Sequence, residues 1–222
     1  NVTYLYKEIS KNKTNIIEID GKALKCNFDV PQGLVGMSVD YYVEYTDDEN
    51  GVVTAINATS DNRVVEFSLD DYEGASSGVM KYLDNDNTVK LNYNATTMII
   101  FNGRRERNYT PENIANYNNG TVKAIDNNED DILDVIYVTN YKDAVVERLY
   151  TESKQVYFAY SQTVDGLRYV SFDDEKLIVD ITNVDGQQLS FDEIPVDSVI
   201  SIAKSNDNKL VKVIVSDKKV AG

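Results

Sequence analysis

The sequence predicts an all-β fold, built as tandem small antiparallel β-barrels of the SH3 or OB type with at most one short helix. Three observations predict it: a composition that favours strands and turns, an alternation of residues with a period of two, and a pattern that recurs about every 80 residues. The 222-residue chain contains 16 Tyr but only 3 Pro, and Asn, Asp, Thr and Val are abundant. Tyr, Thr and Val favour strands, while Asn and Asp favour tight turns.

Internal repetition is the most informative of these observations. The segments 16–56, 98–138 and 177–215 each read as an apolar strand, a turn with Gly, a second strand, a Pro and a hairpin with a polar tip. The glycines are 82 and 83 residues apart (103 − 21, 186 − 103) and the prolines 80 and 84 (111 − 31, 195 − 111). These landmarks are Gly21, Gly103, Gly186, Pro31, Pro111 and Pro195.

A period of this length is longer than that of solenoid repeats, so each copy is predicted to be a small domain. We expect a first β-barrel repeat over 1–62, truncated at its N-terminal end, a second over 63–142 and a third over 143–222. The stretch 140–144, NYKDA, leaves no room for a flexible linker between the second and third copies. The copies are therefore expected to form a rigid series.

The strands and turns inside each copy follow from local patterns. Residues 39–45 place Val and Tyr on every second position, which is typical of one side of a strand. Asp-Gly and Asn-Gly pairs tolerate the positive φ that two-residue hairpin turns require. These pairs stand at 20–21, 50–51, 102–103 and 185–186. Several short strands in so few residues must close on themselves or pack as two layers to hide their edges, which favours barrels.

One segment, 110–117, is expected to be helical for one or two turns. Thr110 can cap its start, Pro111 suits the first helical position, and Glu112 adds negative charge to the first turn.

The charge of the chain restricts its partners. With 37 acidic and 22 basic residues the formal net charge is −15, which repels phosphate backbones and anionic membranes. The apolar runs are too short to cross a bilayer. We therefore expect no nucleic-acid partner and no membrane insertion.

The residue types also argue against an enzyme. The chain has no His, so the single Cys26 cannot form a Cys–His dyad, and zinc sites based on His or on several Cys are excluded. Acidic side chains fall mostly in turns, where they are usually solvated. A glycosidase would need two carboxylates that face each other, which spacing in the sequence cannot establish. Cys26 is expected to be a small buried residue.

The acidic stretch DNNEDDILDV (126–135) is the main candidate for a metal site. Asp126, Asn128, Asp130 and Asp134 could direct oxygen ligands to one side of a tight loop, as Ca²⁺ requires. The stretch resembles the short calcium loops of integrin-type and dockerin-type repeats. It departs from them at Asp131, where they carry Gly, and from the EF-hand at Tyr137, where a bidentate Glu would stand. A solvated hairpin tip is therefore preferred, with calcium as the alternative and no other cofactor.

Two further groups of residues are binding candidates. Arg104, Arg105 and Arg107 form the one basic cluster, which either offsets the negative surface or meets an acidic neighbour or an anionic glycan. An aromatic platform for sugars would draw on exposed tyrosines, or these residues simply cover half-buried positions. The candidates are Tyr41, Tyr42, Tyr45, Tyr157 and Tyr160.

The Asn-Gly turn, the Pro, the segment 120–141 and the strand 144–149 together resemble modules in large virion proteins of phages of low-GC Gram-positive bacteria. They are also similar to modules of S-layer-type cell-surface proteins in the same hosts. This resemblance implies an extracellular structural or adhesion segment of a phage tail or baseplate, or of a cell surface, whose partners are other protein subunits. A carbohydrate-binding module of a surface enzyme or adhesin, with surface glycans as partners, is the alternative.

Overall fold

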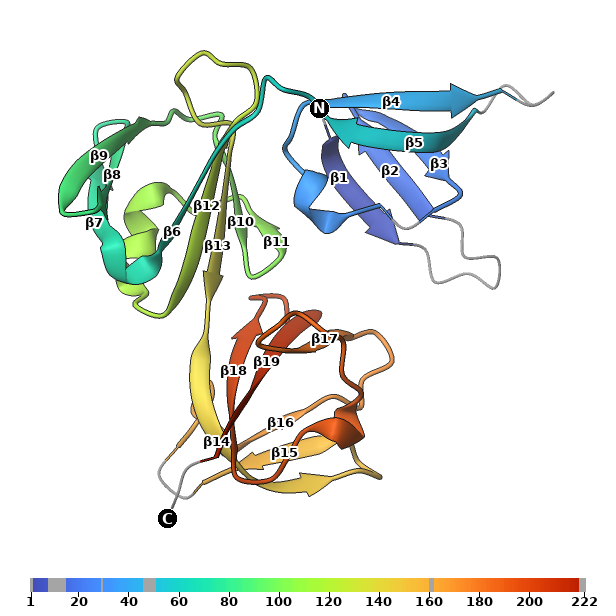
Figure 1. The fold of residues 1–222 in the computed structure, drawn as a ribbon, viewed down its shortest axis with the longest axis vertical. Helices are drawn as coiled ribbons and strands as arrows, with labels where there is room; N and C mark the ends of the chain where they lie inside the picture. Colours follow the sequence, from blue (N-terminus) through green and yellow to red (C-terminus); the bar gives the residue numbers. More distant parts are fainter. Residues whose placement is uncertain (1, 8–14, 29, 46–50, 160–161, 220–222) are drawn as a thin grey trace. The chain divides into compact units, whose positions relative to one another are not determined.

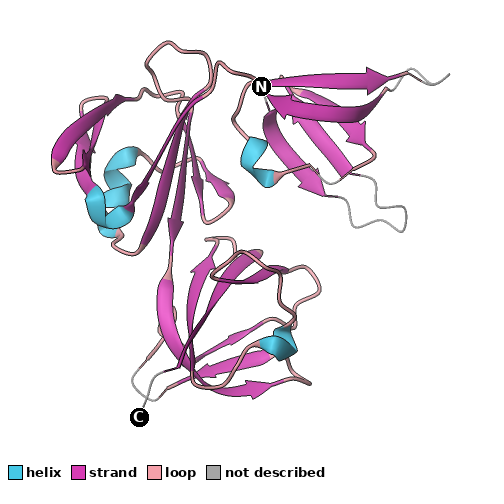
Figure 2. Cartoon of the chain, viewed as in Figure 1, coloured by secondary structure: helices cyan, strands magenta, loops and turns pink. Residues whose placement is uncertain are grey.

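The computed structural model of the chain describes residues 2–7, 15–28, 30–45, 51–159 and 162–219. Strands dominate this part of the chain and the helical segments are short, so the predicted all-β class is confirmed (Figure 2). The four helical segments are 3-10 turns: η1 (Gln32–Leu34), η2 (Leu69–Asp71), η3 (Pro111–Asn116) and η4 (Phe191–Glu193). Among the described residues, none of the helices has the length and apolarity that crossing a membrane requires.

The helical turn expected at 110–117 is confirmed as η3. The N–H of Asn113 donates to the carbonyl of Thr110, and the Asn113 side chain accepts from the Thr110 N–H at 2.8 Å. The other three turns span only three residues each, which is too short to give a helical pattern in the sequence.

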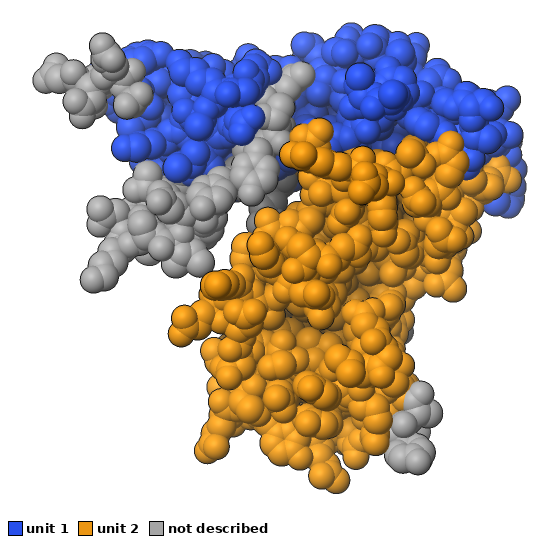
Figure 3. Space-filling view, turned by 180° about the vertical axis from the view of Figure 1, so that it is seen from behind, with its two compact units in different colours: residues 1–66, 75–98, 123–136 blue, residues 67–74, 99–122, 137–222 orange. Residues whose placement is uncertain are grey.

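The chain divides into two compact units (Figure 3). Unit 1 contains residues 1–66, 75–98 and 123–136, and unit 2 contains residues 67–74, 99–122 and 137–222. The first copy of the repeat belongs to unit 1 and the third to unit 2, while the strands of the second copy have residues in both. The three predicted domains remain a prediction.

The first copy forms a five-stranded sheet in the order β1-β2-β3-β5-β4 (Figure 1). Its strands are β1 (Val2–Lys7), β2 (Asn15–Ile19), β3 (Lys22–Cys26), β4 (Val39–Glu44) and β5 (Val52–Ala58). Neighbours pair antiparallel except β3 and β5, which run parallel. The alternating apolar residues of β2 and β3 line the core of this copy, which includes Ile17, Ile19, Leu24, Cys26, Val30 and Val53.

The second copy forms a five-stranded sheet in the order β11-β10-β13-β12-β6 and a three-stranded sheet in the order β7-β8-β9. Its strands are β6 (Arg63–Ser68), β7 (Tyr72–Ser76), β8 (Val79–Asp84), β9 (Asn87–Asn92), β10 (Met98–Phe101), β11 (Arg104–Glu106), β12 (Gly120–Asp126) and β13 (Val135–Asn140). The N–H of Met98 donates to Asp134 and that of Asn102 to Val138. Both offsets are 36 residues (134 − 98, 138 − 102), so β10 and β13 run parallel.

The third copy forms a six-stranded sheet in the order β16-β15-β14-β18-β19-β17. Its strands are β14 (Lys142–Tyr150), β15 (Gln155–Phe158), β16 (Tyr169–Ser171), β17 (Ile178–Asn183), β18 (Ser198–Lys204) and β19 (Leu210–Lys219). The first half of β14 pairs with β18 and the second half with β15. Glu147 is the extra residue of a β-bulge between these halves, because Val146 pairs with Phe158 but Arg148 pairs with Tyr157.

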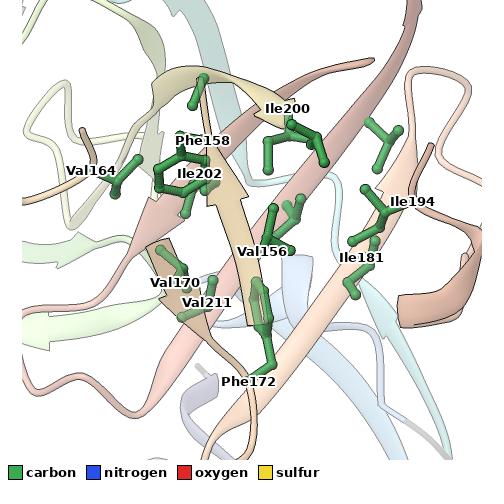
Figure 4. Close-up of a cluster of buried hydrophobic side chains, with 14 residues drawn as sticks. Val156, Phe158, Val164, Val170, Phe172, Ile181, Ile194, Ile200, Ile202 and Val211 are labelled. Atoms are coloured by element: carbon green, nitrogen blue, oxygen red, sulfur yellow. The ribbon is translucent and has the colours of Figure 1, made fainter. Parts of the chain in front are cut away.

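The bulge lets one strand serve two sheets, and these sheets enclose a single core. Side chains of the strands on either side of β14 meet in this core, among them Phe158 of β15, Ile202 of β18 and Val211 of β19 (Figure 4). Phe158 and Val211 are fully buried and Ile202 is 1% exposed. In this copy the six-stranded sheet is thus divided at β14 into two parts around one core, and its strand order among the described residues is open, from β16 to β17, rather than that of a closed barrel.

Each copy contains the same set of three adjacent strands, which the sequence did not predict. The final hairpin of the copy lies beside one earlier strand that runs parallel to its second strand. The sets are β4-β5-β3, β12-β13-β10 and β18-β19-β17. In the second and third copies the parallel strand precedes the repeated Gly, whereas in the first copy it follows Gly21.

Candidate functional site

The acidic tip of the β12–β13 hairpin is closed by its own backbone. Each of the four predicted ligands directs a side-chain oxygen at a loop N–H. Asp126 accepts from the N–H groups of Asn128 and Asp131 at 3.2 and 3.0 Å. The other three acceptors are Asn128 for the Asp130 N–H, Asp130 for the Ile132 N–H and Asp134 for the Asn127 N–H, at 3.0, 2.9 and 2.8 Å. The pattern is a series of Asx turns.

Asp131 adopts the left-handed conformation that calcium loops assign to Gly. We expected Asp131 to adopt the left-handed conformation less easily than the Gly of calcium loops, yet it has φ +63°. Asp tolerates this region better than most residues, and its side chain pairs with Arg63 at 2.8 Å across the surface. The missing Gly is therefore no obstacle to the loop geometry.

The electrostatics of the tip raise the pKa of Asp134 above its ordinary value. Burial is the largest cause, the charges of Asp130 and Asp126 add to it, and the hydrogen bond from the Asn127 N–H opposes it. Across the described residues, no group of three or more His, Cys, Asp or Glu side chains is placed to hold one metal ion. Calcium binding by Asp126, Asn128, Asp130 and Asp134 remains a prediction.

The same tip docks on the first copy, within unit 1. The buried Asn127 side chain donates to the carbonyl of Gly36 at 2.9 Å. Gly36 has φ +84°, and a Cβ added there would lie 2.4 Å from Cγ2 of Val135. Because only Gly allows both the conformation and the close approach, Gly36, Asn127 and Val135 define what we call the first joint.

The tip of the β18–β19 hairpin docks on the second copy, within unit 2. The Asn102 side chain, which is 3% exposed, donates to the carbonyl of Lys204 at 2.7 Å. Its oxygen also accepts from the N–H of Asn140 at 2.8 Å. The neighbouring Gly103 lies against the end of Leu210, since a Cβ there would be 3.1 Å from Cδ1. We call the contact of the β10–β11 turn with this tip the second joint.

Polar side chains surround the second joint. Asn206 donates to Glu106 at 3.1 Å and to the hydroxyl of Tyr109 at 3.2 Å. Asp207 lies 3.6 Å from Nε of Arg104. Burial by itself would raise the pKa of Asp207, but the Ser205 hydroxyl, the Lys209 N–H and the charges of Arg104 and Lys209 together lower it.

The remaining candidates of the sequence analysis have simpler positions. Arg104 meets an acidic neighbour, whereas Arg105 and Arg107 are exposed. Cys26 is buried as expected and is a free thiol. Burial raises the pKa of this thiol to about 11, so little nucleophilic thiolate is present near neutral pH.

The connections between copies are short and hydrogen-bonded. Four residues separate β5 from β6, and the Asn62 side chain in this turn accepts from the Ser38 N–H at 2.7 Å and donates to the Ser38 carbonyl at 2.9 Å. One residue, Tyr141, separates β13 from β14, and its N–H donates to Asn119 at 2.7 Å. Residues 140–144 thus lie in β13 and β14 apart from Tyr141, and the rigid series of copies remains a prediction.

The predicted tyrosine platform is divided between two places. Three of its members, on or next to the edge strand β4, are exposed: Tyr41, Tyr42 and Tyr45. Tyr160 lies outside the described residues, as do residues 46–50 of the first copy's hairpin tip. Tyr157 instead contacts two tyrosines that the sequence analysis missed. Its ring centroid lies 5.2 Å from those of both Tyr150 and Tyr169. Alternation in YVS (169–171) and the turn 151–154 were the available signals.

The joints were missed for a different reason. Asn102 and Lys204 are 102 residues apart, and Asn127 and Gly36 are 91 apart. No local pattern marks an Asn as the donor of such a distant contact.

Comparison of the chain with protein-family models, with curated proteins and with solved structures finds no match.

Proposed function

We propose that the chain is a non-enzymatic structural segment of a larger extracellular assembly, in which its β copies act as spacers that hold neighbouring parts at a fixed separation. The observation that supports this role is the pair of joints. In each, the hairpin tip of one copy docks on the preceding copy through a buried Asn amide. A spacer needs such contacts because unsupported copies would move independently.

Two further features favour the spacer role. The connections at 59–62 and 141 are short, and each is hydrogen-bonded to the copy that precedes it. We therefore expect the chain to rotate little at these two connections. The sequence resemblance to modules of phage virion and bacterial cell-surface proteins supports a tail, baseplate or surface layer as the assembly, with other protein subunits as partners. The acidic tips then serve as docking elements.

Nuclear spin relaxation of 15N-labelled chain tests the role directly. Amides of 99–122 in the second copy and of 162–219 in the third are expected to report one common rotational correlation time. Asn102→Ala should make the third copy tumble faster, because the second joint loses its buried donor. Asn57→Ala, at an exposed position of β5, is the matched control and should change nothing. Independent tumbling of these segments in the unaltered chain would refute the proposal.

A further inference from the structure

The outer face of β14, β15 and β16 carries an arrangement that the spacer role does not use. Inward residues of these strands, such as Val156 and Val170, belong to the core. The outward residues form two cross-strand rows. The first row is Arg148, Tyr157 and Tyr169, and the second is Tyr150, Gln155 and Ser171.

The three tyrosines form one aromatic cluster. The rings of Tyr157 and Tyr169 are stacked, with an angle of 18° between their planes. Tyr150 meets Tyr157 edge-on at 70°. Tyr150 is 45% exposed and Tyr169 is 36% exposed, so the cluster lies open to solvent. Such rings combine an apolar surface with polar hydroxyl tips, which matches the C–H face and hydroxyl edge of a sugar ring.

Charge determines which sugar fits. Arg148 continues the row of Tyr157 and Tyr169, and its side chain is 67% exposed. The Glu147 carboxylate lies 3.8 Å from Nε of Arg148 and only 3.1 Å from Nη2 of Arg168. The Arg148 guanidinium is thus exposed and only loosely paired, on a chain whose net charge is −15. A guanidinium beside an aromatic surface is suited to a carboxylate on a stacked ring.

The geometry points to a binding site for acidic polysaccharide on this face: pyranose rings pack against the exposed rings of Tyr150 and Tyr169, which Tyr157 supports between them, and a uronic-acid carboxylate pairs with Arg148. The site adds a ligand to the chain and does not depend on the spacer role. Gln155 and Ser171 lie in the second row, where their polar groups meet sugar hydroxyls.

Titration calorimetry and 15N–1H chemical-shift mapping on the full chain test this site. The probes are hexagalacturonate and a hyaluronan hexasaccharide, with maltohexaose and cellohexaose as neutral counterparts of the same length. At least one acidic probe should bind at least tenfold more tightly than both neutral ones, with shifts confined to 148–157 and 169–171. Absence of binding by both acidic probes at millimolar concentration, equal binding of neutral probes, or shifts elsewhere would overturn the proposal.

Variants separate binding from sheet stability, because cross-strand aromatic pairs also stabilise a sheet by themselves. Tyr157→Ala should weaken acidic-probe binding at least tenfold, and Tyr157→Phe should retain most of it. Arg148→Gln should remove the preference for the acidic probe while leaving the melting temperature unchanged. Tyr42→Ala, at an exposed tyrosine of β4, is the matched control and should bind like the unaltered chain. If Tyr157→Ala unfolds, Tyr150→Ala at the strand end provides the same test, and unchanged binding in it would refute the site.

Discussion

The two joints use the same donor in different surroundings. In both, the amide of a buried Asn donates to a backbone carbonyl of another copy. The first joint packs Gly36 against the branched Val135 with no space for one more carbon, whereas Gly103 of the second joint faces the flexible end of Leu210. The second joint is also surrounded by an ion pair and amide contacts. One hairpin tip can therefore dock either by close packing or by an adaptable polar network.

The largest expected effect comes from removing the space at the first joint. Gly36→Ala should lower the free energy of unfolding by about 3 kcal/mol, since it adds a clash with Val135 to the strain of a positive φ. Gly21→Ala is the control, because Gly21 has φ +78° but no neighbour within 4 Å, and should cost about 1 kcal/mol. Gly103→Ala should fall between them. Urea denaturation measures all three, and equal costs at Gly36 and Gly21 would contradict the close-packing account.

Loss of each buried amide should have the next largest effect. Asn102→Ala and Asn127→Ala are each expected to destabilise the chain by about 1–3 kcal/mol, because a buried carbonyl loses its donor. Asn102→Ala should be the more costly, since the Asn140 N–H also loses its acceptor. Thermal and urea unfolding check both, with Asn57→Ala expected within about 0.5 kcal/mol of the unaltered chain. The reverse order would show that the first joint holds the stronger hydrogen bond.

The two tips should respond to acid in opposite directions. The pKa of Asp207 is lowered, so its ionised form stabilises the fold above its ordinary value of 3.8, and this contribution is lost as the pH falls through the folded value. The pKa of Asp134 is raised, so its ionised form costs stability near neutral pH, and the cost disappears as the pH falls through its folded value.

At pH 7, Asp207→Asn should therefore destabilise and Asp134→Asn should stabilise, each by less than about 1 kcal/mol because both groups are partly solvated. Melting temperatures from pH 7 to pH 3 should show the difference from the unaltered chain fading first for Asp134→Asn. Shifts of the same sign for both variants would show that the tips do not differ electrostatically.

Calcium should have the smallest effect. The carboxylates of 126–134 are engaged by backbone N–H groups, so the melting temperature should be the same in millimolar Ca²⁺ and in chelator. An increase with Ca²⁺ that Asp130→Asn abolishes would instead establish the predicted metal site.

Local chemistry made part of this fold predictable. Asp20-Gly21 and Asn102-Gly103 have φ values of +50° and +78°, and +45° and +81°, as hairpin turns of this sequence require. Thr110 and Pro111 marked η3, which is the one helical turn of more than three residues in the described part of the chain. These features depend on neighbours within a few positions, which one sequence contains.

Long-range pairing was not predictable from the same information. The parallel pair in each copy depends on which earlier strand lies beside the second strand of the final hairpin. In the first copy this is the strand after the repeated Gly, and in the other two copies it is the strand before it. The bulge at Glu147 and the pairing of Tyr157 with Arg148 follow from the register between β14 and β15, which alternation alone does not specify.

The path of mechanical tension through the third copy follows from its strand order. β14 and β19 both pair antiparallel with β18 and so run in the same direction on either side of it. Pulling on the start of β14 and the end of β19 would slide these strands past β18, loading many hydrogen bonds at once in shear instead of opening them one by one. Because one residue separates β13 from β14, tension from the preceding copy would enter this clamp with almost no slack.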